Sequence, residues 1–366
     1  MKNLSRKTGL NHAVRVTVAA MSIVLGLGAA VPAAAQCPGD VVATGGVDGV
    51  DLAAVLGAWG TNGQGALVTD LNGDGIVNGA DLALILGSWG PCPSGPVVAW
   101  GTNVYGESHV PSDLGSCTAV AAGYYHSLAL RIDGTIRAWG ANGAGQCNIP
   151  SDLGTCRAVA AGYSHSLALR VDGTVRAWGY NDYGQCNIPS DLGTCMAISG
   201  GEYHTIALRT DGTVRAWGRN NYGQCNIPTD LGPCTAIAGG GYHTIALRTD
   251  GTVRAWGENL SGQCNIPTNL GPCKAIAAGF KYSHAVRLDG NVRAWGDTAY
   301  GASNVPVDLV PCVMIATGQI HTLALRSDGA LRAWGWNQYG QCNIPAGLGP
   351  CLSIAGGRSH TVVVKR

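Results

Sequence analysis

The chain has 366 residues, of which 46% are hydrophobic and 12% charged, with a formal net charge of +1. This length allows two or three domains, and the low charge with a good apolar fraction disfavours a disordered chain. The first 35 residues hold four basic side chains, so the rest has 19 basic residues against 22 acidic ones, a balance of −3. That balance disfavours nucleic acid or an anionic membrane as a partner.

Residues 1–35 predict an export signal. A basic start is followed by an apolar stretch from about Val16 to Val31 and by three alanines before Gln36. A membrane anchor is the alternative, but the apolar stretch is short and rich in Gly and Ala. We therefore expect a secreted protein, extracellular or periplasmic, with attachment to the cell surface left open. In that oxidising space we expect the 14 cysteines to form disulfides.

Residues 36–93 predict a calcium-binding module. They hold six carboxylates and no Lys or Arg, and two segments, Asp40 to Trp59 and Asp70 to Trp89, match at an offset of 30 residues. The second segment places oxygen ligands at the loop positions that Ca²⁺ requires, with a glycine at the sharp turn. The predicted ligands are Asp70, Asn72, Asp74, the carbonyl of Ile76, Asn78 and Asp81.

The first loop of this module predicts a weak or empty site. It keeps acidic residues at three positions (Asp40, Asp48 and Asp51) but has Val42 and Thr44 at positions 3 and 5, and a valine cannot ligate a cation. Each loop leads into apolar residues spaced as one helix face: Leu52, Val55 and Leu56, then Leu82, Leu84, Ile85 and Leu86.

The duplicated loop and helix pattern resembles a dockerin domain. The resemblance implies a cohesin-like partner on a scaffold or a cell surface. We expect Cys37 and Cys92, which flank the module, to join its two ends through a disulfide.

A repeat of 39 residues fills the remainder of the chain. Residues 94–366 number 273, which is seven units of 39, and a Trp-Gly pair recurs once per unit, at Trp100, Trp139, Trp178, Trp217, Trp256, Trp295 and Trp334. A fixed period of this size indicates a solenoid or a propeller. Each unit holds strand signals around an Asp-Gly turn, as in Asp133-Gly134, and a short fourth strand near Gly145 to Cys147.

These signals predict an all-β, seven-bladed propeller of four-stranded antiparallel blades, preceded by the small α-helical calcium-binding domain. The repeats open with a lone Trp-Gly strand, Val97 to Trp100, and end with the strand His360 to Lys365. Each end lacks what the other supplies. We therefore expect the N-terminal strand to complete the last blade and remove the exposed edges of an open sheet.

The repeated pattern Ala-Gly-x-x-His-[Ser/Thr]-x-Ala-Leu-Arg-x-Asp-Gly-Thr-Val-Arg-Ala-Trp-Gly resembles the regulator-of-chromosome-condensation repeat family. The resemblance implies a seven-bladed propeller used for protein recognition. The family includes an exchange factor for a nuclear GTPase and a secreted bacterial inhibitor of β-lactamases. An exported chain cannot meet a nuclear GTPase, and β-lactamase inhibition would rest on fold analogy alone.

Five pairs of cysteines stand nine residues apart. A ladder that pairs Cys156 with Cys186 also gives five bonds, but three strand spacings of about 4.8 Å would separate these two residues by roughly 14 Å, beyond the reach of a disulfide. Cys117 and Cys312 are left over, each a buried thiol or an intermolecular contact. The expected bonds are Cys147–Cys156, Cys186–Cys195, Cys225–Cys234, Cys264–Cys273 and Cys342–Cys351.

The recurring polar residues predict structure rather than catalysis. A histidine occupies one position in six units and Tyr282 replaces it in the other, so we expect hydrogen bonds within each blade and no metal site. Of 16 carboxylates in the repeats, 11 recur at two fixed positions, and nothing singles out a facing pair such as a glycosidase needs. We therefore expect no enzymatic activity. The five irregular carboxylates are Glu107, Asp182, Glu202, Glu258 and Asp297.

Variation among the copies predicts a binding face. The residue after each Trp-Gly differs in all seven units, and the two residues before each His position also vary. In an up-and-down blade these loops lie at one end and the Asp-Gly turns at the other. Tyr, Trp and Arg anchor many protein interfaces, although drift in exposed loops would also produce variation. The predicted ligand face comprises Tyr105, Tyr124, Tyr125, Tyr180, Tyr183, Glu202, Tyr203, Arg219, Tyr222, Glu258, Trp336, Tyr339 and Arg358.

The sequence thus predicts a secreted, monomeric, non-enzymatic propeller that recognises a protein and is tethered by a calcium-dependent module. The alternatives are a sugar-binding propeller that uses exposed aromatic rings, and an inhibitor of an extracellular enzyme.

Overall fold

The computed structural model describes residues 46–47, 49–61, 69, 71, 76–87, 90–91, 94–309 and 311–366. Several predictions lie outside these residues: the export signal, the flanking cysteines Cys37 and Cys92, and the loop residues Asp40, Asp48, Asp70, Asn72 and Asp74. Within the described segments, no helix has the length and apolar character needed to cross a membrane.

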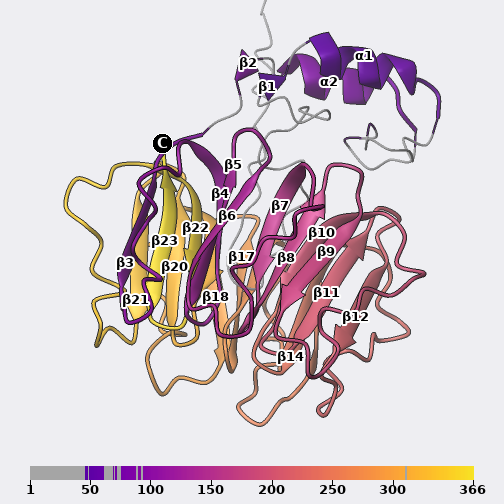
Figure 1. The fold of residues 1–366 in the computed structure, drawn as a ribbon. Helices are drawn as coiled ribbons and strands as arrows, with labels where there is room; N and C mark the ends of the chain where they lie inside the picture. Colours follow the sequence, from indigo (N-terminus) through magenta and orange to yellow (C-terminus); the bar gives the residue numbers. More distant parts are fainter. Residues whose placement is uncertain are drawn as a thin grey trace, which may run out of the picture.

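Each repeat forms an antiparallel sheet of three strands, and seven such sheets surround one axis (Figure 1). The sheets are β4 (Cys117–Ala122), β5 (His126–Arg131) and β6 (Ile136–Gly140); β7 (Cys156–Ala161), β8 (His165–Arg170) and β9 (Val175–Gly179); β10 (Cys195–Gly200), β11 (His204–Arg209) and β12 (Val214–Gly218); β13 (Cys234–Gly239), β14 (His243–Arg248) and β15 (Val253–Gly257); β16 (Cys273–Ala278), β17 (Tyr282–Arg287) and β18 (Val292–Gly296); β19 (Cys312–Thr317), β20 (His321–Arg326) and β21 (Leu331–Gly335); and β22 (Cys351–Gly356), β23 (His360–Lys365) and β3 (Val97–Gly101).

The N-terminal strand closes the ring. Strand β3 pairs antiparallel with β23, so that Val98 lies opposite Val363 and Trp100 opposite Thr361. The first strands of neighbouring blades contact one another all the way round, and β22 contacts β4. The predicted closure of the last blade is therefore confirmed.

The predicted fourth strand is wrong, because the described blades have three strands each. The segment that follows β6 forms local turns, with hydrogen bonds from the backbone N–H of Gly145 to Asn142, of Asn148 to Gly145 and of Leu153 to Pro150. These bonds use the groups that a fourth strand would need for a ladder, and Pro150 has no N–H to offer.

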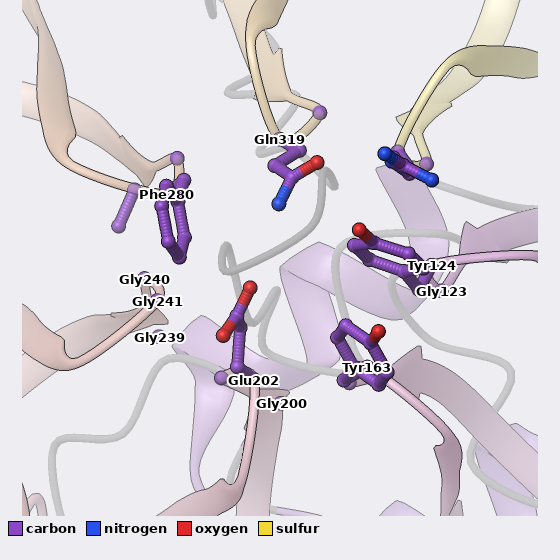
Figure 2. Close-up of a pocket in the computed structure, with 17 residues that line it drawn as sticks. Gly123, Tyr124, Tyr163, Gly200, Glu202, Gly239, Gly240, Gly241, Phe280 and Gln319 are labelled. Atoms are coloured by element: carbon purple, nitrogen blue, oxygen red, sulfur yellow. The ribbon is translucent and has the colours of Figure 1, made fainter.

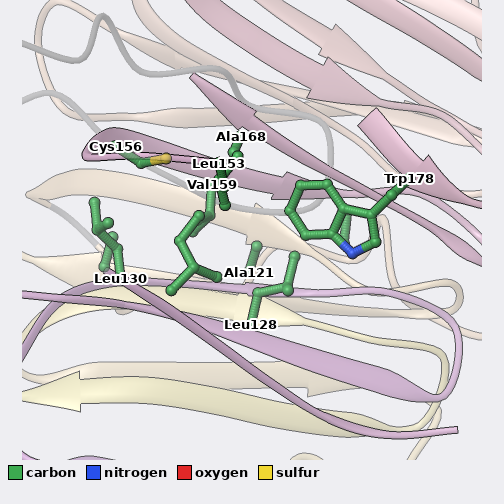
Figure 3. Packing of buried hydrophobic residues seen from close by; sticks show 11 residues of the cluster. Ala121, Leu128, Leu130, Leu153, Cys156, Val159, Ala168 and Trp178 are labelled. Atoms are coloured by element: carbon green, nitrogen blue, oxygen red, sulfur yellow. The ribbon is translucent and has the colours of Figure 1, made fainter. Parts of the chain in front are cut away.

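The hydrophobic core lies between neighbouring blades. Trp178 of β9 packs with Leu128, Ile136 and Leu153 of the preceding unit (Figure 3). Its indole Nε1 donates to the carbonyl of Gln146, 3.0 Å away, so the turn segment of one unit is anchored to the next blade. Truncating a buried aromatic residue of this kind typically costs about 3–5 kcal/mol.

The glycine of each Trp-Gly pair is required by the backbone. Gly140 has φ of +103°, and a Cβ there would lie 2.5 Å from the carbonyl oxygen of Tyr125. Only glycine adopts this conformation without strain and allows the close approach. The next residue, Ala141, then donates its N–H to the same carbonyl at 2.8 Å.

Two short helices precede the propeller. Helix α1 (Gly49–Gly57) contacts α2 (Gly79–Gly87), and the two-residue strands β1 (Gly46–Val47) and β2 (Gly90–Pro91) pair with each other. Val47, Val55, Val77 and Ile85 form a small core. Of the apolar residues predicted to share a helix face, Val55 and Ile85 are buried, whereas Leu56, Leu84 and Leu86 are exposed by 50%, 37% and 56%.

The candidate recognition face and its axial pocket

The recurring histidines join neighbouring blades. The Nε2 of His126 lies 3.1 Å from the hydroxyl of Ser166 in the next blade, and His360 of the last blade reaches Ser127 of the first at 3.0 Å. The prediction of a structural role fits this arrangement, but the bonds run between blades and not within one. The remaining links are His165–Thr205, His204–Thr244, His243–Ser283 and His321–Thr361, and Tyr282 donates to the carbonyls of Gly318 and His321.

This belt fixes the protonation of the imidazoles. The hydroxyl of Ser166 donates to the carbonyl of Gln146 at 2.7 Å, so its oxygen accepts from the Nε2–H of His126. The ring packs against Gly123, where a Cβ would lie 2.1 Å from its Cε1. Burial lowers the pKa of His126 to about 4, so the histidine is neutral at pH 7.

The two variable loops of each blade meet at one end of the propeller, as predicted. The backbone N–H of Arg219, directly after a Trp-Gly pair, donates to the carbonyl of Tyr203 at 2.8 Å, and Glu258 donates likewise to Tyr242. All seven units make this bond. We call the end formed by residues 102–109, 124–125 and their equivalents in the other units the recognition face.

Ion pairs gather at the opposite end. In the described residues every ion pair is arginine with aspartate, and each aspartate comes either from an Asp-Gly turn or from the position after the recurring proline. Examples are Arg170–Asp172 and Arg215–Asp191. The cations of the recognition face, Arg219, Lys281 and Arg358, belong to none of these pairs.

Aromatic rings connect the loops of neighbouring blades on the recognition face. Ring centroids lie 3.9 Å apart for Tyr124 and Tyr163, 5.2 Å for Tyr163 and Tyr203, and 6.3 Å for Tyr203 and Tyr242. The guanidinium of Arg219 lies 5.1 Å from the ring centroid of Tyr242. The series, which we call the aromatic arc, comprises Tyr105, Tyr125, Tyr124, Tyr163, Tyr203, Tyr242 and Phe280.

A pocket of about 380 Å³, open to solvent, lies on the propeller axis at the centre of this face (Figure 2). One variable residue per blade lines it, above a floor of glycines. Backbone bonds between neighbouring lining loops complete a circuit, from Tyr124 N–H to the Tyr163 carbonyl through to Arg358 N–H to the Tyr124 carbonyl. The seven residues are Tyr124, Tyr163, Glu202, Gly241, Phe280, Gln319 and Arg358.

Glu202 carries the acidic group of this axial pocket, and its carboxylate is drawn towards the centre in Figure 2. Burial raises the pKa of Glu202 to about 7, against a hydrogen bond from the Tyr242 hydroxyl and the charge of Arg219, which lower it. Among the described residues, Glu202 forms no ion pair within 4.0 Å.

The structure sorts the predicted face residues by exposure. Tyr105, Tyr183, Tyr222 and Tyr339 are exposed, whereas Tyr124, Tyr125, Tyr180, Glu202, Tyr203, Arg219, Trp336 and Arg358 are half-buried. Glu258 was wrongly included, because it is 5% exposed and its carboxylate accepts from the Gln263 amide at 3.2 Å.

The sequence interpretation recorded Tyr163, Tyr242, Phe280 and Gln319 only as loop variation and left them out of the predicted face. The structure places Tyr163, Phe280 and Gln319 in the axial pocket and Tyr242 beside Glu202. Aligning the first variable residue of each loop by the 39-residue period would have grouped the pocket residues.

The predicted disulfides are wrong for the described cysteines, which are all free thiols. The Cys147 thiol donates to the carbonyl of Ala141, directly after the C-terminal end of β6. The N–H of Cys156 donates to the carbonyl of Gly134, before the N-terminal end of β6. A five-residue strand separates these levels by about 16 Å, and bridged Cα atoms must lie within about 7 Å. The same offset applies to Cys186–Cys195, Cys225–Cys234, Cys264–Cys273 and Cys342–Cys351, while Cys117 and Cys312 are buried thiols.

Three of the predicted calcium ligands are described. The Asp81 carboxylate is buried and accepts from the backbone N–H of Leu71 at 2.7 Å and of Asn78 at 2.9 Å. Asn78 caps helix α2 through Ala80 N–H and donates to the Ile76 carbonyl. Asp51 of the first loop is also fully buried.

Comparison with known proteins agrees with the fold. The model of the Regulator of chromosome condensation (RCC1) repeat matches residues 117–146, 156–185, 197–224, 234–263 and 315–341. The unit in which Tyr282 replaces the histidine is not among the matches. No curated protein matches the sequence significantly.

Solved structures show the same architecture at low sequence identity. Prp20p of Saccharomyces cerevisiae is 20% identical over 75% of this chain and 91% of its own, with a TM-score of 0.64. Human WBSCR16 is 19% identical over 74% of this chain and 99% of its own, with a TM-score of 0.63. The ectodomain of the Arabidopsis thaliana receptor kinase ACR4 is 21% identical over 65% of this chain and 88% of its own, with a TM-score of 0.54. Five segments of the chain therefore match the RCC1 repeat, and the fold is that of an RCC1-like propeller.

Proposed function

We propose that this protein is a non-enzymatic recognition propeller that binds a protein partner through the recognition face. The observation that carries the proposal is the separation of charges. Arginine–aspartate pairs neutralise each other at the Asp-Gly end, while Arg219, Lys281 and Arg358 lie over aromatic rings and belong to none of these pairs. Arginine and tyrosine side chains dominate the binding energy of many protein interfaces.

The structural relatives support a role in protein binding. The Prp20p structure is described together with the binding of Prp20p to Gsp1p and histones. Another structure shows Kap60 bound to Prp20p. These partners belong to Prp20p. For the present chain they support only the use of such a propeller as a protein-binding scaffold.

The irregular carboxylates support a non-enzymatic role. Glu107 is buried and accepts from the N–H of Tyr105, as Gln185 does from Tyr183 in its own unit. Glu258 is bonded to Gln263. Glu202 is the one irregular carboxylate among the residues that line the axial pocket. General acid–base chemistry on sugars needs two carboxylates that flank one bond.

The exposed tyrosines of the recognition face favour a second candidate, a sugar-binding propeller. Exposed tyrosine rings offer flat surfaces on which sugar rings stack, and Tyr105, Tyr183 and Tyr222 are about half exposed. Binding on a glycan array that is lost with Tyr183→Ala would favour this candidate. A third candidate is inhibition, in which the protein partner is an extracellular enzyme.

We also propose that the protein is exported and that residues 36–93 bind Ca²⁺ and dock to a cohesin-like partner. The buried Asp81 carboxylate, at the last ligand position, is oriented by the backbone N–H groups of Leu71 and Asn78. Leu56, Trp59, Leu84 and Leu86 expose apolar surface near this loop for a partner. Adding a chelator should increase hydrogen exchange in residues 36–93 and leave the propeller unchanged. Equal exchange in both states would contradict the calcium proposal.

The recognition face can be tested by substitution at its variable positions. The triple variant Tyr180→Ala, Arg219→Ala and Trp336→Ala should lose capture of partners from the native extracellular fraction without losing thermal stability. The control variant Leu288→Ser and Val307→Ser alters exposed residues away from this face. Undiminished capture by the triple variant, or loss in the control alone, would contradict the proposed face.

A further inference from the structure

The axial pocket combines three properties that suit one kind of ligand group. Its lining includes the aromatic rings of Tyr124, Tyr163 and Phe280; its acid, Glu202, is half-buried; and glycines from all seven blades complete the lining (Figure 2). The phenyl ring of Phe280 packs where a side chain on Gly241 would lie, with Cδ2 2.6 Å from the position of a Cβ. Phe280 therefore fills the position that a side chain of the Gly241 blade would take in the lining.

Among the described residues, the Glu202 carboxylate has no cation within 4.0 Å, although the charges of Arg219 and Lys281 act on it from farther away. Burying a carboxylate away from water costs free energy unless an opposite charge or several hydrogen-bond donors compensate it. The hydroxyl of Tyr242 donates a hydrogen bond to the Glu202 carboxylate. Arg219 stacks over tyrosine rings, at 5.1 Å from the centroids of both Tyr183 and Tyr242, and its charge also acts on Glu202 from beyond ion-pair distance. The charged and titratable groups that face Glu202 are Tyr163, Tyr203, Arg219, Tyr242, Glu258 and Lys281, with Arg358 across the pocket.

Charge and shape together select a slender cation. An ammonium group gains from a carboxylate and from the faces of aromatic rings, while an alkyl stem gains from the apolar walls. A lysine side chain has both parts and a compact head. The planar guanidinium of arginine is wider, and Arg358 already occupies one side of the rim through its contact with Tyr124 at 4.7 Å.

We propose that the axial pocket receives a lysine side chain of the partner protein, whose ammonium group pairs with Glu202 between the rings of Tyr163 and Phe280. This inference rests on the proposed function, because it specifies what the partner inserts at the centre of the recognition face.

The pocket can be tested without knowing the partner. The probe is Nα-acetyl-lysine methylamide, titrated into the full-length protein by calorimetry, with the norleucine analogue as the uncharged control of equal stem length. We expect saturable binding with a Kd of about 1–10 mM, no binding of the norleucine analogue, and at least about a tenfold loss in Glu202→Gln. Asp182→Asn, which removes an exposed carboxylate of the same face, should bind as the wild type does.

The pH dependence supplies a readout that does not need the variant. Burial raises the pKa of Glu202 to about 7, while lysine stays charged, so affinity should rise between pH 6 and pH 8. Equal affinity in Glu202→Gln, binding of the norleucine analogue, or no saturation at about 50 mM would overturn the inference.

The inference and the proposed function can fail separately. If the triple variant loses partner capture while the lysine probe binds nowhere on the wild type, the recognition face stands and the lysine pocket is wrong. If the probe binds through Glu202 while the triple variant captures partners normally, the pocket binds a lysine side chain but Tyr180, Arg219 and Trp336 do not carry partner binding.

Discussion

Six buried histidines link neighbouring blades through their Nε2 atoms, and each receives no hydrogen bond at Nδ1 in the described structure. The glycine three residues earlier lets the imidazole approach the backbone, as at Gly123 and His126. The sequence repeats Gly-x-x-His for this reason. A histidine held in this way carries its proton on Nε2, and a second proton on Nδ1 would have no acceptor among the described residues.

The histidine belt predicts a loss of stability in acid. Burial lowers the pKa of His126, His204 and His321 to about 4 and that of His165, His243 and His360 to about 3. Because unfolded histidines titrate near pH 6.5, the unfolded chain binds more protons below that pH. The free energy of unfolding should be constant above pH 7 and fall below pH 6.5 by about 1.4 kcal/mol per pH unit for each histidine that titrates.

Urea denaturation at half-unit steps from pH 8 to pH 4.5 measures this effect. Below pH 6.5, the slope of the free energy of unfolding against pH should correspond to the uptake of several protons on unfolding. A free energy that stays constant between pH 7 and pH 5 would contradict the neutral belt.

At the scale of the elements, the turn segment after the third strand takes the place of the predicted fourth strand. It carries a cysteine at the level of the recognition face, while the next cysteine begins the following blade at the level of the Asp-Gly turn. The sequence spacing of nine residues suggested proximity, but an extended segment of nine residues spans the height of a blade. The number of residues between two cysteines does not reveal whether the segment between them crosses from one end of the propeller to the other.

Free thiols in the blades predict a simple labelling result. Alkylation under denaturing conditions without reductant should modify all 12 described cysteines, including Cys147 and Cys156. Burial raises the pKa of Cys156 to about 12, so labelling of the folded protein at pH 8 should be slow. Peptides joined as Cys147–Cys156 in mass spectrometry would contradict the assigned positions.

At the scale of the whole molecule, the ring depends on both ends of the repeat region. Strand β3 is the outer strand of the last blade, and Trp100 donates from its indole to the carbonyl of Gln341, 3.0 Å away. Without β3, β23 would expose an unpaired edge, and such edges promote association.

A truncated chain tests this closure. A protein that begins at residue 102 should unfold at a lower temperature than one that begins at residue 94, and it should associate in size-exclusion chromatography. Equal melting temperatures and a monomeric truncated protein would show that β3 does not hold the ring closed.

The period of the Trp-Gly pairs, the Asp-Gly turns and the complementary ends predicted the closed ring and the grouping of the variable loops. These features are local or periodic, so a sequence records them directly. The exposure of Glu258 and the inward position of Phe280 and Gln319 depend on side-chain contacts. The Glu258 carboxylate turns inwards to Gln263, five residues later, and Phe280 meets Tyr242 of the preceding blade, and neither contact follows from the repeat pattern.

The most direct measurement of the central claim is hydrogen exchange of the propeller with and without a captured partner. Peptides covering residues 102–109, 124–125 and their equivalents in the other units should become protected, with the strongest protection around Glu202. The Asp-Gly turns should exchange as in the free protein. Protection confined to those turns, with unchanged exchange in the variable loops, would contradict the account.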